Sequence, residues 1–268
     1  MNKRFFTPEP RIFAHRGDSL NFPENTLPSF RSAVDMGVDV IETDVHRTRD
    51  GHFVVLHDDH MSRVTDGAGR ARDLTLEEIR RMDAGYRFTP DGQNFPFRGK
   101  GVTISTLEEV LAAFPEQRFN VDLKDNNPAQ ARDYCALIRG LNAEGRVLTA
   151  SEYSGNLKAV RKLLPEMATS ASRWEIMGVY FLFRSGLLVA KKKLAADALQ
   201  IPEFFGTSHV ASPGFIRALH GMDVKVHVWT VNREVDMKRL LDAGADAIMS
   251  DNPALLKKVI AEHEPPRG

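Results

Sequence analysis

The sequence predicts an α/β fold, specifically a (β/α)8 TIM barrel. Eight short apolar runs of strand length recur along the 268 residues, and a segment of helix size follows each run. A doubly wound open sheet is the alternative, but no glycine-rich dinucleotide fingerprint follows the first run. The segment 60–101 breaks the alternation and is rich in Arg, Asp, Gly and Pro. It is interpreted as a small inserted lobe that follows the second strand and its hairpin and lies over one end of the barrel.

The first strand is expected at 11–15, and the first helix at 24–36, with Asn25 or Thr26 as its N-cap and Gly37 as its stop. The second strand, at 38–46, leads into a hairpin. Further strands are expected at 119–124, 147–151, 167–172, 198–203, 224–231 and 247–251. Helices are expected at 128–140, 155–164, 176–194, 212–220, 233–243 and 253–263, with a short one at 75–82 in the lobe. Residues 1–268 are expected to form one domain that includes this lobe.

The stretch 38–59 is where chemistry is expected. Its alternation puts Glu42 and Asp44 on one strand face, with about 6–7 Å between their Cα atoms. The Asp-Gly turn at 50–51 predicts an antiparallel hairpin in which paired residue numbers sum to 101, so that Asp44 faces His57. Two like charges on one face cost energy unless a cation or a donor network compensates them. A solvated polar face is the alternative.

Charged side chains cluster at the predicted C-terminal strand ends, where barrel enzymes carry their chemistry. These positions are His15, Arg16, Glu42, Asp44, His57, Asp122, Lys124, Trp229, Asn232 and Asp251. The carboxylates of Glu42, Asp44 and Asp122, without a thiolate, indicate a site for one divalent cation, Mg²⁺ or Ca²⁺, with Mn²⁺ as a third candidate. Zinc is less expected, although the two histidines could reach it.

The cations beside this site indicate a phosphate ligand. Arg16 and Lys124 supply fixed positive charge that would neutralise phosphoryl oxygens. His15 and His57 are suited to general acid–base catalysis, because the unperturbed imidazole pKa lies near neutrality. Together these residue types predict metal-dependent cleavage of a phosphodiester. His46 shares the carboxylate face but is interpreted as a surface or packing residue.

The ordered motifs AHRG, PENT, IETDVHRTRDG, VVLHDD, VDLK, VWTVN and SDNP resemble the glycerophosphodiester phosphodiesterase family, from about residue 11 to 257. The resemblance implies a barrel enzyme that hydrolyses glycerophosphodiesters to glycerol 3-phosphate and an alcohol. It also implies roles for particular residues: His15 and His57 as the acid–base pair, Glu42 and Asp44 as metal ligands, Arg16 and Lys124 as phosphate ligands, and Trp229 as a wall of the substrate pocket. The family usually has Glu as the third metal ligand, whereas this chain has the shorter Asp122. Glu24 lies close to His15 in the sequence, but the PENT motif to which it belongs is interpreted as a helix start.

Two other functions remain open from the sequence. A lysophospholipase D that acts on single-chain phospholipids would need an apolar groove, for which the segment 176–190 is the candidate. This segment is too short and too interrupted to span a bilayer. With Lys191, Lys192 and Lys193 after it, peripheral membrane contact is conceivable, although a buried barrel helix is the preferred interpretation. A barrel that binds phosphodiesters without cleaving them is the alternative from another class.

Charge and cysteine content exclude some partners. Basic and acidic residues both number 36, so the zero net charge offers no footprint for nucleic acid. Cys135 is the only cysteine, which excludes an intrachain disulfide and favours a reducing, cytoplasmic location. It falls in a helical pattern and is expected in the core. The N-terminal residues show no apolar stretch typical of a signal peptide. The oligomeric state is left open.

Overall fold

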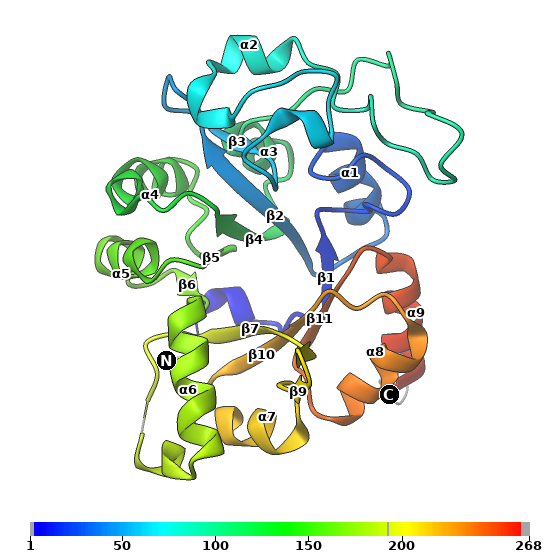
Figure 1. Ribbon diagram of the computed structural model, residues 1–268. Coiled ribbons are helices and arrows are strands. Elements are labelled where there is room, and N and C mark those ends of the chain that lie inside the picture. Colours follow the sequence, from blue (N-terminus) through cyan, green and yellow to red (C-terminus); the bar gives the residue numbers. More distant parts are fainter. Residues whose placement is uncertain (1–2, 192, 264–268) are drawn as a thin grey trace.

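Eight parallel strands form a nearly closed ring in the computed structural model, which describes residues 3–191 and 193–263 (Figure 1). The order around the ring is β6, β5, β4, β2, β1, β11, β10, β7. A parallel bridge between Ser170 and Ala198 joins the two ends, and the Ala171 amide donates to the Ala198 carbonyl at 2.8 Å. The predicted (β/α)8 barrel is therefore confirmed. Its strands are β1 (Ile12–His15), β2 (Val40–Arg47), β4 (Arg118–Leu123), β5 (Val147–Ala150), β6 (Ala168–Thr169), β7 (Ala198–Pro202), β10 (Lys225–Trp229) and β11 (Ala247–Ser250).

Helices surround the ring on its outer side (Figure 1). Apolar side chains between strands and helices form the largest core cluster, which includes the buried Cys135. The surrounding helices are α1 (Leu27–Asp35), α3 (Leu107–Ala113), α4 (Ala131–Gly140), α5 (Ser154–Leu163), α6 (Arg173–Arg184), α7 (Pro213–His220), α8 (Glu234–Asp242) and α9 (Pro253–His263). Shorter elements are α2 (Leu76–Arg80), the 3-10 turns η1 (Arg4–Phe6), η2 (Met61–Arg63), η3 (Ala71–Asp73), η4 (Pro128–Gln130) and η5 (Leu187–Ala190), and the strands β3 (Phe53–Val55), β8 (Phe204–Phe205) and β9 (Ser208–His209).

Helix α3 is absent from the sequence-based prediction. It begins with a capping box: the Glu109 amide donates to the Thr106 hydroxyl at 3.1 Å, and the Thr106 amide donates to the Glu109 carboxylate at 2.8 Å. A Thr followed three residues later by Glu, before an apolar run, is a recognisable helix start. The signal was therefore present in the sequence.

The helix expected at 176–194 is too long. Helix α6 ends at Arg184, and Gly186 then adopts a left-handed conformation with φ 74°. A residue without Cβ tolerates this conformation, which stops the helix. The chain continues in the separate turn η5. Lys192, part of the expected helix, lies outside the described residues.

The predicted hairpin forms, but the predicted register is wrong by one residue. Val45 pairs with Val55, so paired numbers sum to 100 rather than 101, and Asp44 does not lie opposite His57. The turn contains three residues instead of two, because Gly51 takes a left-handed conformation with φ 94° at its last position. His57 still reaches the site, since it lies beyond the end of β3, where the alternation of a strand no longer dictates its direction.

The ring is plugged at its N-terminal end. Phe5 and Phe6 of η1 are buried against a layer of inward-pointing side chains. That layer consists of Phe13, Val40, Leu148, Ala168, Ala198, Ala247 and Met249. The polar side chains His227, Gln200 and Asn120 lie next to this layer and contact one another.

A lobe leaves the barrel between β3 and α3. It contains η2, η3 and α2, and lies above the barrel in Figure 1. Its apolar cluster packs on Val54 and Leu56 of the hairpin and consists of Met61, Ala71, Leu76, Ile79, Ala84, Val102 and Ile104. The lobe therefore has a small core of its own and adjoins the segment that carries His57.

His227 gives the interior a testable pH dependence. Its ring is fully buried against Phe13, with 4.7 Å between ring centroids, and burial lowers its pKa to about 4. The unfolded chain, with a pKa of about 6.5 at this residue, therefore takes up the proton first as the pH falls. The stability associated with the neutral ring is present above about pH 6.5 and is lost as the pH falls toward about 4. The loss between about pH 7 and pH 5 is roughly 2 kcal/mol.

We expect His227→Leu to remove about that much of the pH dependence of the free energy of unfolding. Urea unfolding of both proteins at the two pH values measures it. Equal pH dependence in the two proteins would show that His227 is not held neutral.

Candidate active site

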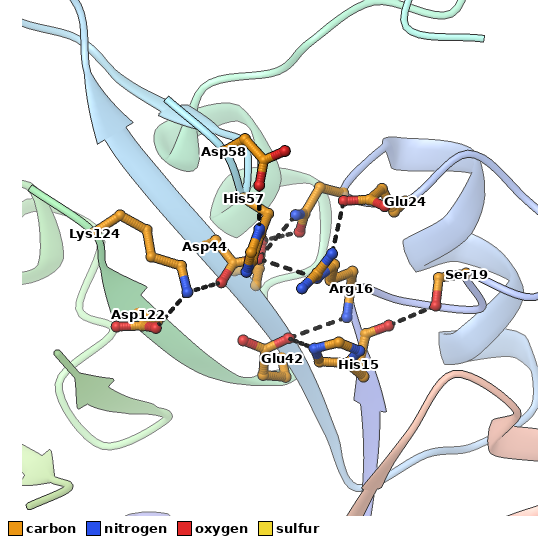
Figure 2. A network of polar contacts seen from close by, with 12 residues as sticks. His15, Arg16, Ser19, Glu24, Glu42, Asp44, His57, Asp58, Asp122 and Lys124 are labelled. Carbon is orange, nitrogen blue, oxygen red and sulfur yellow. Dashed lines mark hydrogen bonds and ion pairs between the residues drawn. The ribbon is translucent and has the colours of Figure 1, made fainter. Parts of the chain in front are cut away.

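Side chains from three neighbouring strands and the hairpin meet at the C-terminal rim (Figure 2). Strand register places His15 beside Glu42, and Asp44 beside Asp122. The structure also brings in the predicted residues Arg16, His57 and Lys124. Trp229, 44% exposed, ends β10 at the same rim. It lies outside the network of contacts in Figure 2.

His15 is held by a carboxylate that follows the last strand. Its Nδ1 lies 2.7 Å from Asp251 Oδ1, and its Nε2 lies 3.9 Å from Glu42 Oε2. Asn232 and Ser19 donate to Asp251 at 2.6 and 3.1 Å. Burial lowers the pKa of His15, but the bond to Asp251 and the charge of Glu42 outweigh it, so that its pKa is raised.

His57 has the same kind of support from another element. Its Nδ1 lies 2.6 Å from Asp58 Oδ1, and Asp58 is paired with Arg63 of the lobe. Burial lowers the pKa of His57, and the nearby Lys124 and Arg16 lower it further, against the charge of Asp44. The pKa values of the two histidines are thus shifted in opposite directions. Such a pair can have one protonated and one neutral ring near neutral pH, as acid–base chemistry requires.

His46 is buried and supports the segment that carries His57. Its Nε2 lies 3.0 Å from the backbone carbonyl of His57, and its Nδ1 lies 2.8 Å from Asp125. Asp125 also accepts from the Arg47 amide at 2.7 Å. The interpretation of His46 as a surface or packing residue is therefore wrong, because the ring is buried and its hydrogen bonds support the site.

Two acidic side chains on β2 are almost completely buried. Glu42 is 5% exposed and Asp44 1%. Burial and the charge of Asp44 raise the pKa of Glu42 to about 7. The pKa of Asp44 is lowered in spite of its burial, chiefly because of Lys124 and Arg16. Asn25, in a left-handed conformation, donates to Asp44 at 3.0 Å. Two cations and a neutral donor therefore stabilise the ionised Asp44.

Lys124 lies between two of the three predicted metal ligands. Its Nζ is 2.9 Å from Asp44 Oδ1 and 2.8 Å from Asp122 Oδ2 (Figure 2). Within residues 3–191 and 193–263, no group of three or more Asp, Glu, His or Cys side chains is assembled to hold a metal ion. The carboxylate oxygens of Glu42, Asp44 and Asp122 nevertheless suit a hard divalent cation, which prefers oxygen ligands. For such an ion to contact Asp44 and Asp122 together, the ammonium group must leave its position between them.

Glu24 belongs to the site and not to the helix start. Its carboxylate accepts from Arg16 at 3.0 Å and from Arg63 at 2.6 and 2.8 Å. The N-cap of α1 is Thr26, the last residue of the PENT motif, so the helix-start interpretation of the motif is confirmed. Glu24 itself joins the guanidinium beside Asp44 to the lobe.

The sequence-based reasoning placed Asp251 at the rim without a role and missed the other residues that orient the predicted ones. Asp251 and Asp58 fix the two histidines, while Asn25 and Arg63 hold Asp44 and Asp58. The position of Asp58 directly after His57 could have indicated its role. Nothing in the sequence indicated that Arg63 also pairs with Glu24, which lies 39 residues away.

Comparisons with known proteins agree with this geometry. Residues 15–255 match the model of the glycerophosphoryl diester phosphodiesterase family. A glycerophosphodiester phosphodiesterase of Caldanaerobacter subterraneus subsp. tengcongensis is 34% identical over 93% of this chain and 97% of its own. Mouse lysophospholipase D GDPD1 is 27% identical over 92% of this chain and 85% of its own. A solved Oleispira antarctica phosphodiesterase in complex with the product sn-glycerol-3-phosphate superposes with a TM-score of 0.75. It is 26% identical and covers 96% of this chain and 98% of its own.

Replacing Lys124 tests the charge compensation. We expect Lys124→Gln to lower the free energy of unfolding by roughly 3 kcal/mol in the presence of EDTA, because it leaves the buried Asp44 with less compensating charge. The matched control is Lys238→Gln. Lys238 also contacts two carboxylates, Glu234 at 2.6 Å and Glu262 at 3.2 Å, but all three side chains are more than 40% exposed.

We expect the control to cost less than about 1 kcal/mol, because solvent screens exposed ion pairs. Urea denaturation measures both variants. Equally small losses would contradict a compensating role for Lys124.

Proposed function

The chain belongs to the glycerophosphoryl diester phosphodiesterase family, and from this premise we propose that its barrel rim hydrolyses glycerophosphodiesters to glycerol 3-phosphate and an alcohol. The observation that carries the proposal is the pair of carboxylate-anchored imidazoles, His15 and His57, at one rim with Glu42 and Asp44. A barrel that only binds phosphodiesters would have no need for this pair.

In the proposed reaction, Arg16 and Lys124 hold the phosphate. Their fixed charges compensate the negative charge on the phosphoryl oxygens as the transition state forms. One imidazole removes the proton from the attacking hydroxyl, and the other donates a proton to the departing alcohol. Asp251 and Asp58 hold the rings through Nδ1, which leaves each Nε2 available to the substrate. Trp229 is assigned to the wall of the substrate pocket because of its exposed position at the rim.

We further propose that Glu42, Asp44 and Asp122 hold one divalent cation, Mg²⁺ or Ca²⁺, with Mn²⁺ as a third candidate. When bound, the ion would add positive charge next to the phosphoryl group. Burial and the neighbouring Asp44 charge raise the pKa of Glu42. A cation bound beside Glu42 would counter both effects and favour its ionised form, which supports the assignment. Asp122 is one methylene shorter than the usual glutamate, so the third bond is expected to be weaker or to run through water.

Water-soluble diesters such as glycerophosphocholine are the proposed substrates, and single-chain lysophospholipids are the alternative. The sn-glycerol-3-phosphate in the Oleispira antarctica structure favours a substrate with a glycerol phosphate moiety. The name of the mouse relative is the reason to keep lysophospholipids as the alternative substrate. A cytoplasmic location stays an expectation, which rests on the single cysteine and which cell fractionation would test.

Assays with glycerophosphocholine and lysophosphatidylcholine separate the two substrate classes. We expect release of choline from glycerophosphocholine, because the cations and carboxylates at the rim are suited to binding a polar phosphodiester. Turnover of the lysolipid alone would overturn the soluble-substrate proposal.

Removal of either imidazole should suppress turnover. We expect His15→Ala and His57→Ala each to lower kcat for glycerophosphocholine by about 10²–10⁴-fold, because each loses one proton-transfer group. His52→Ala, at an exposed position in the hairpin turn, is the control and should keep full activity. Unchanged kcat in either site variant would remove that histidine from the mechanism.

Metal removal tests the carboxylate assignment. We expect EDTA to abolish turnover and one of Mg²⁺, Ca²⁺ or Mn²⁺ to restore it. Asp122→Glu should lower the ion concentration needed for half-maximal activity, since the longer side chain reaches the ion directly. Full activity after exhaustive chelation would refute the metal assignment.

A further inference from the structure

Helix α6 carries an apolar stripe on its outer side. Trp174, Met177 and Phe181 are 70%, 47% and 69% exposed. Their spacing of three and four residues places them on one helix face. The helix packs on the barrel through the opposite side, where Val179 is buried and Phe183 lies 5.0 Å from Phe215 between ring centroids. The outer stripe is therefore not needed to attach α6 to the barrel.

The turn η5 extends this apolar surface beyond the helix. Leu187 and Val189 are 57% and 92% exposed. The turn also borders an apolar groove of about 630 Å³, with Lys191 at its edge. In Figure 1 the helix lies at the periphery of the barrel, so its outer side is free to approach a surface. We refer to Trp174, Met177, Phe181, Leu187 and Val189 as the α6 surface.

The charge around the C-terminal part of the α6 surface is positive. Residues 176–196 contain no Asp or Glu, although the whole chain has zero net charge. Arg184, Lys191 and Lys193 are exposed here. Lys192 adds a positive charge in the sequence but lies outside the described residues.

At the other end of the α6 surface, near Trp174, the acidic Glu175 and Glu152 are paired with Arg161 and Arg173. An apolar face with exposed lysines at one end is typical of segments that lie in the headgroup region of anionic bilayers.

We propose that the α6 surface docks the protein on an anionic lipid bilayer. No helix in the described residues is long and apolar enough to cross a membrane, so the contact is peripheral. A second copy of the chain fits less well, because a two-fold contact would bring the cationic borders of both copies together. The lipid phosphates, in contrast, compensate Lys191 and Lys193 while the aromatic side chains enter the interface.

This inference goes beyond the proposed hydrolysis and does not depend on it. The α6 surface contains no residue assigned to the chemistry. Substitutions at Phe181 and Val189 should therefore leave the turnover of soluble glycerophosphocholine unchanged. Failure of lipid docking and failure of the proposed hydrolysis are thus distinguishable.

The test uses the intact protein with phosphatidylcholine vesicles, with and without phosphatidylglycerol. Trp174 is a reporter, because the chain has only two tryptophans and Trp229→Phe removes the other. We expect a blue shift of its fluorescence and co-sedimentation only with phosphatidylglycerol present. Raised salt should weaken both signals, because it screens the lysine charges.

Two double variants separate the apolar and ionic contributions. Phe181→Ser with Val189→Ser should weaken binding at least tenfold, because these side chains then no longer bury apolar area. The control is Val235→Ser, which removes a 54% exposed side chain from α8. Lys191→Glu with Lys193→Glu should weaken binding more than about 25-fold, at about fivefold for each charge near the membrane.

The matched charge control is Lys100→Glu with Lys258→Glu, which makes the same change in net charge at exposed positions of the lobe and of α9. Absence of binding to the anionic vesicles would overturn the proposal, as would equal losses in variants and controls. Sedimentation equilibrium measures the oligomeric state as the last part of the test. A dimer dissociated by Phe181→Ser with Val189→Ser would identify the α6 surface as a subunit interface and also overturn lipid docking.

Discussion

The site depends on how the barrel tolerates two buried carboxylates on one strand. Glu42 and Asp44 lie two residues apart and point toward the same rim, where water is largely excluded. The charge of Asp44 is compensated from the neighbouring strands, by Lys124 after β4 and by Arg16 after β1. Burial and the charge of Asp44 instead raise the pKa of Glu42. The same cations suit a phosphate, so the groups that stabilise Asp44 are also those proposed to hold the substrate.

The two histidines show how the architecture brings the proposed catalytic groups to one rim. His15 comes from a strand of the ring, whereas His57 comes from the hairpin that leads into the lobe. Each ring is anchored through Nδ1 by an aspartate, and His46 holds the backbone carbonyl of His57. A chain of ion pairs through Asp58, Arg63 and Glu24 then reaches Arg16. The lobe is thereby connected by ion pairs to His57, the proposed proton-transfer group, and to Arg16, the proposed phosphate ligand.

The outer ring of helices is not uniform. Most of these helices bury one apolar side and expose polar groups, as expected for the outer layer of a barrel. Helix α6 exposes Trp174 and Phe181 as well, and the adjoining segment lacks acidic residues. The stability of the barrel does not require such a surface, which is why we look for its role in contact with a partner.

The sequence by itself determined the barrel, the order of its strands and the residues at their ends. Apolar runs and strand alternation are local properties, and the ordered motifs identified the family. The tertiary structure decided the hairpin register, since Gly51 selects a three-residue turn that no strand pattern encodes. It also decided that Glu24 pairs with Arg63 and that Asp251 anchors His15 across 236 residues of sequence. Such contacts form only when the ring closes, because closure brings strand ends that are remote in the chain to one rim.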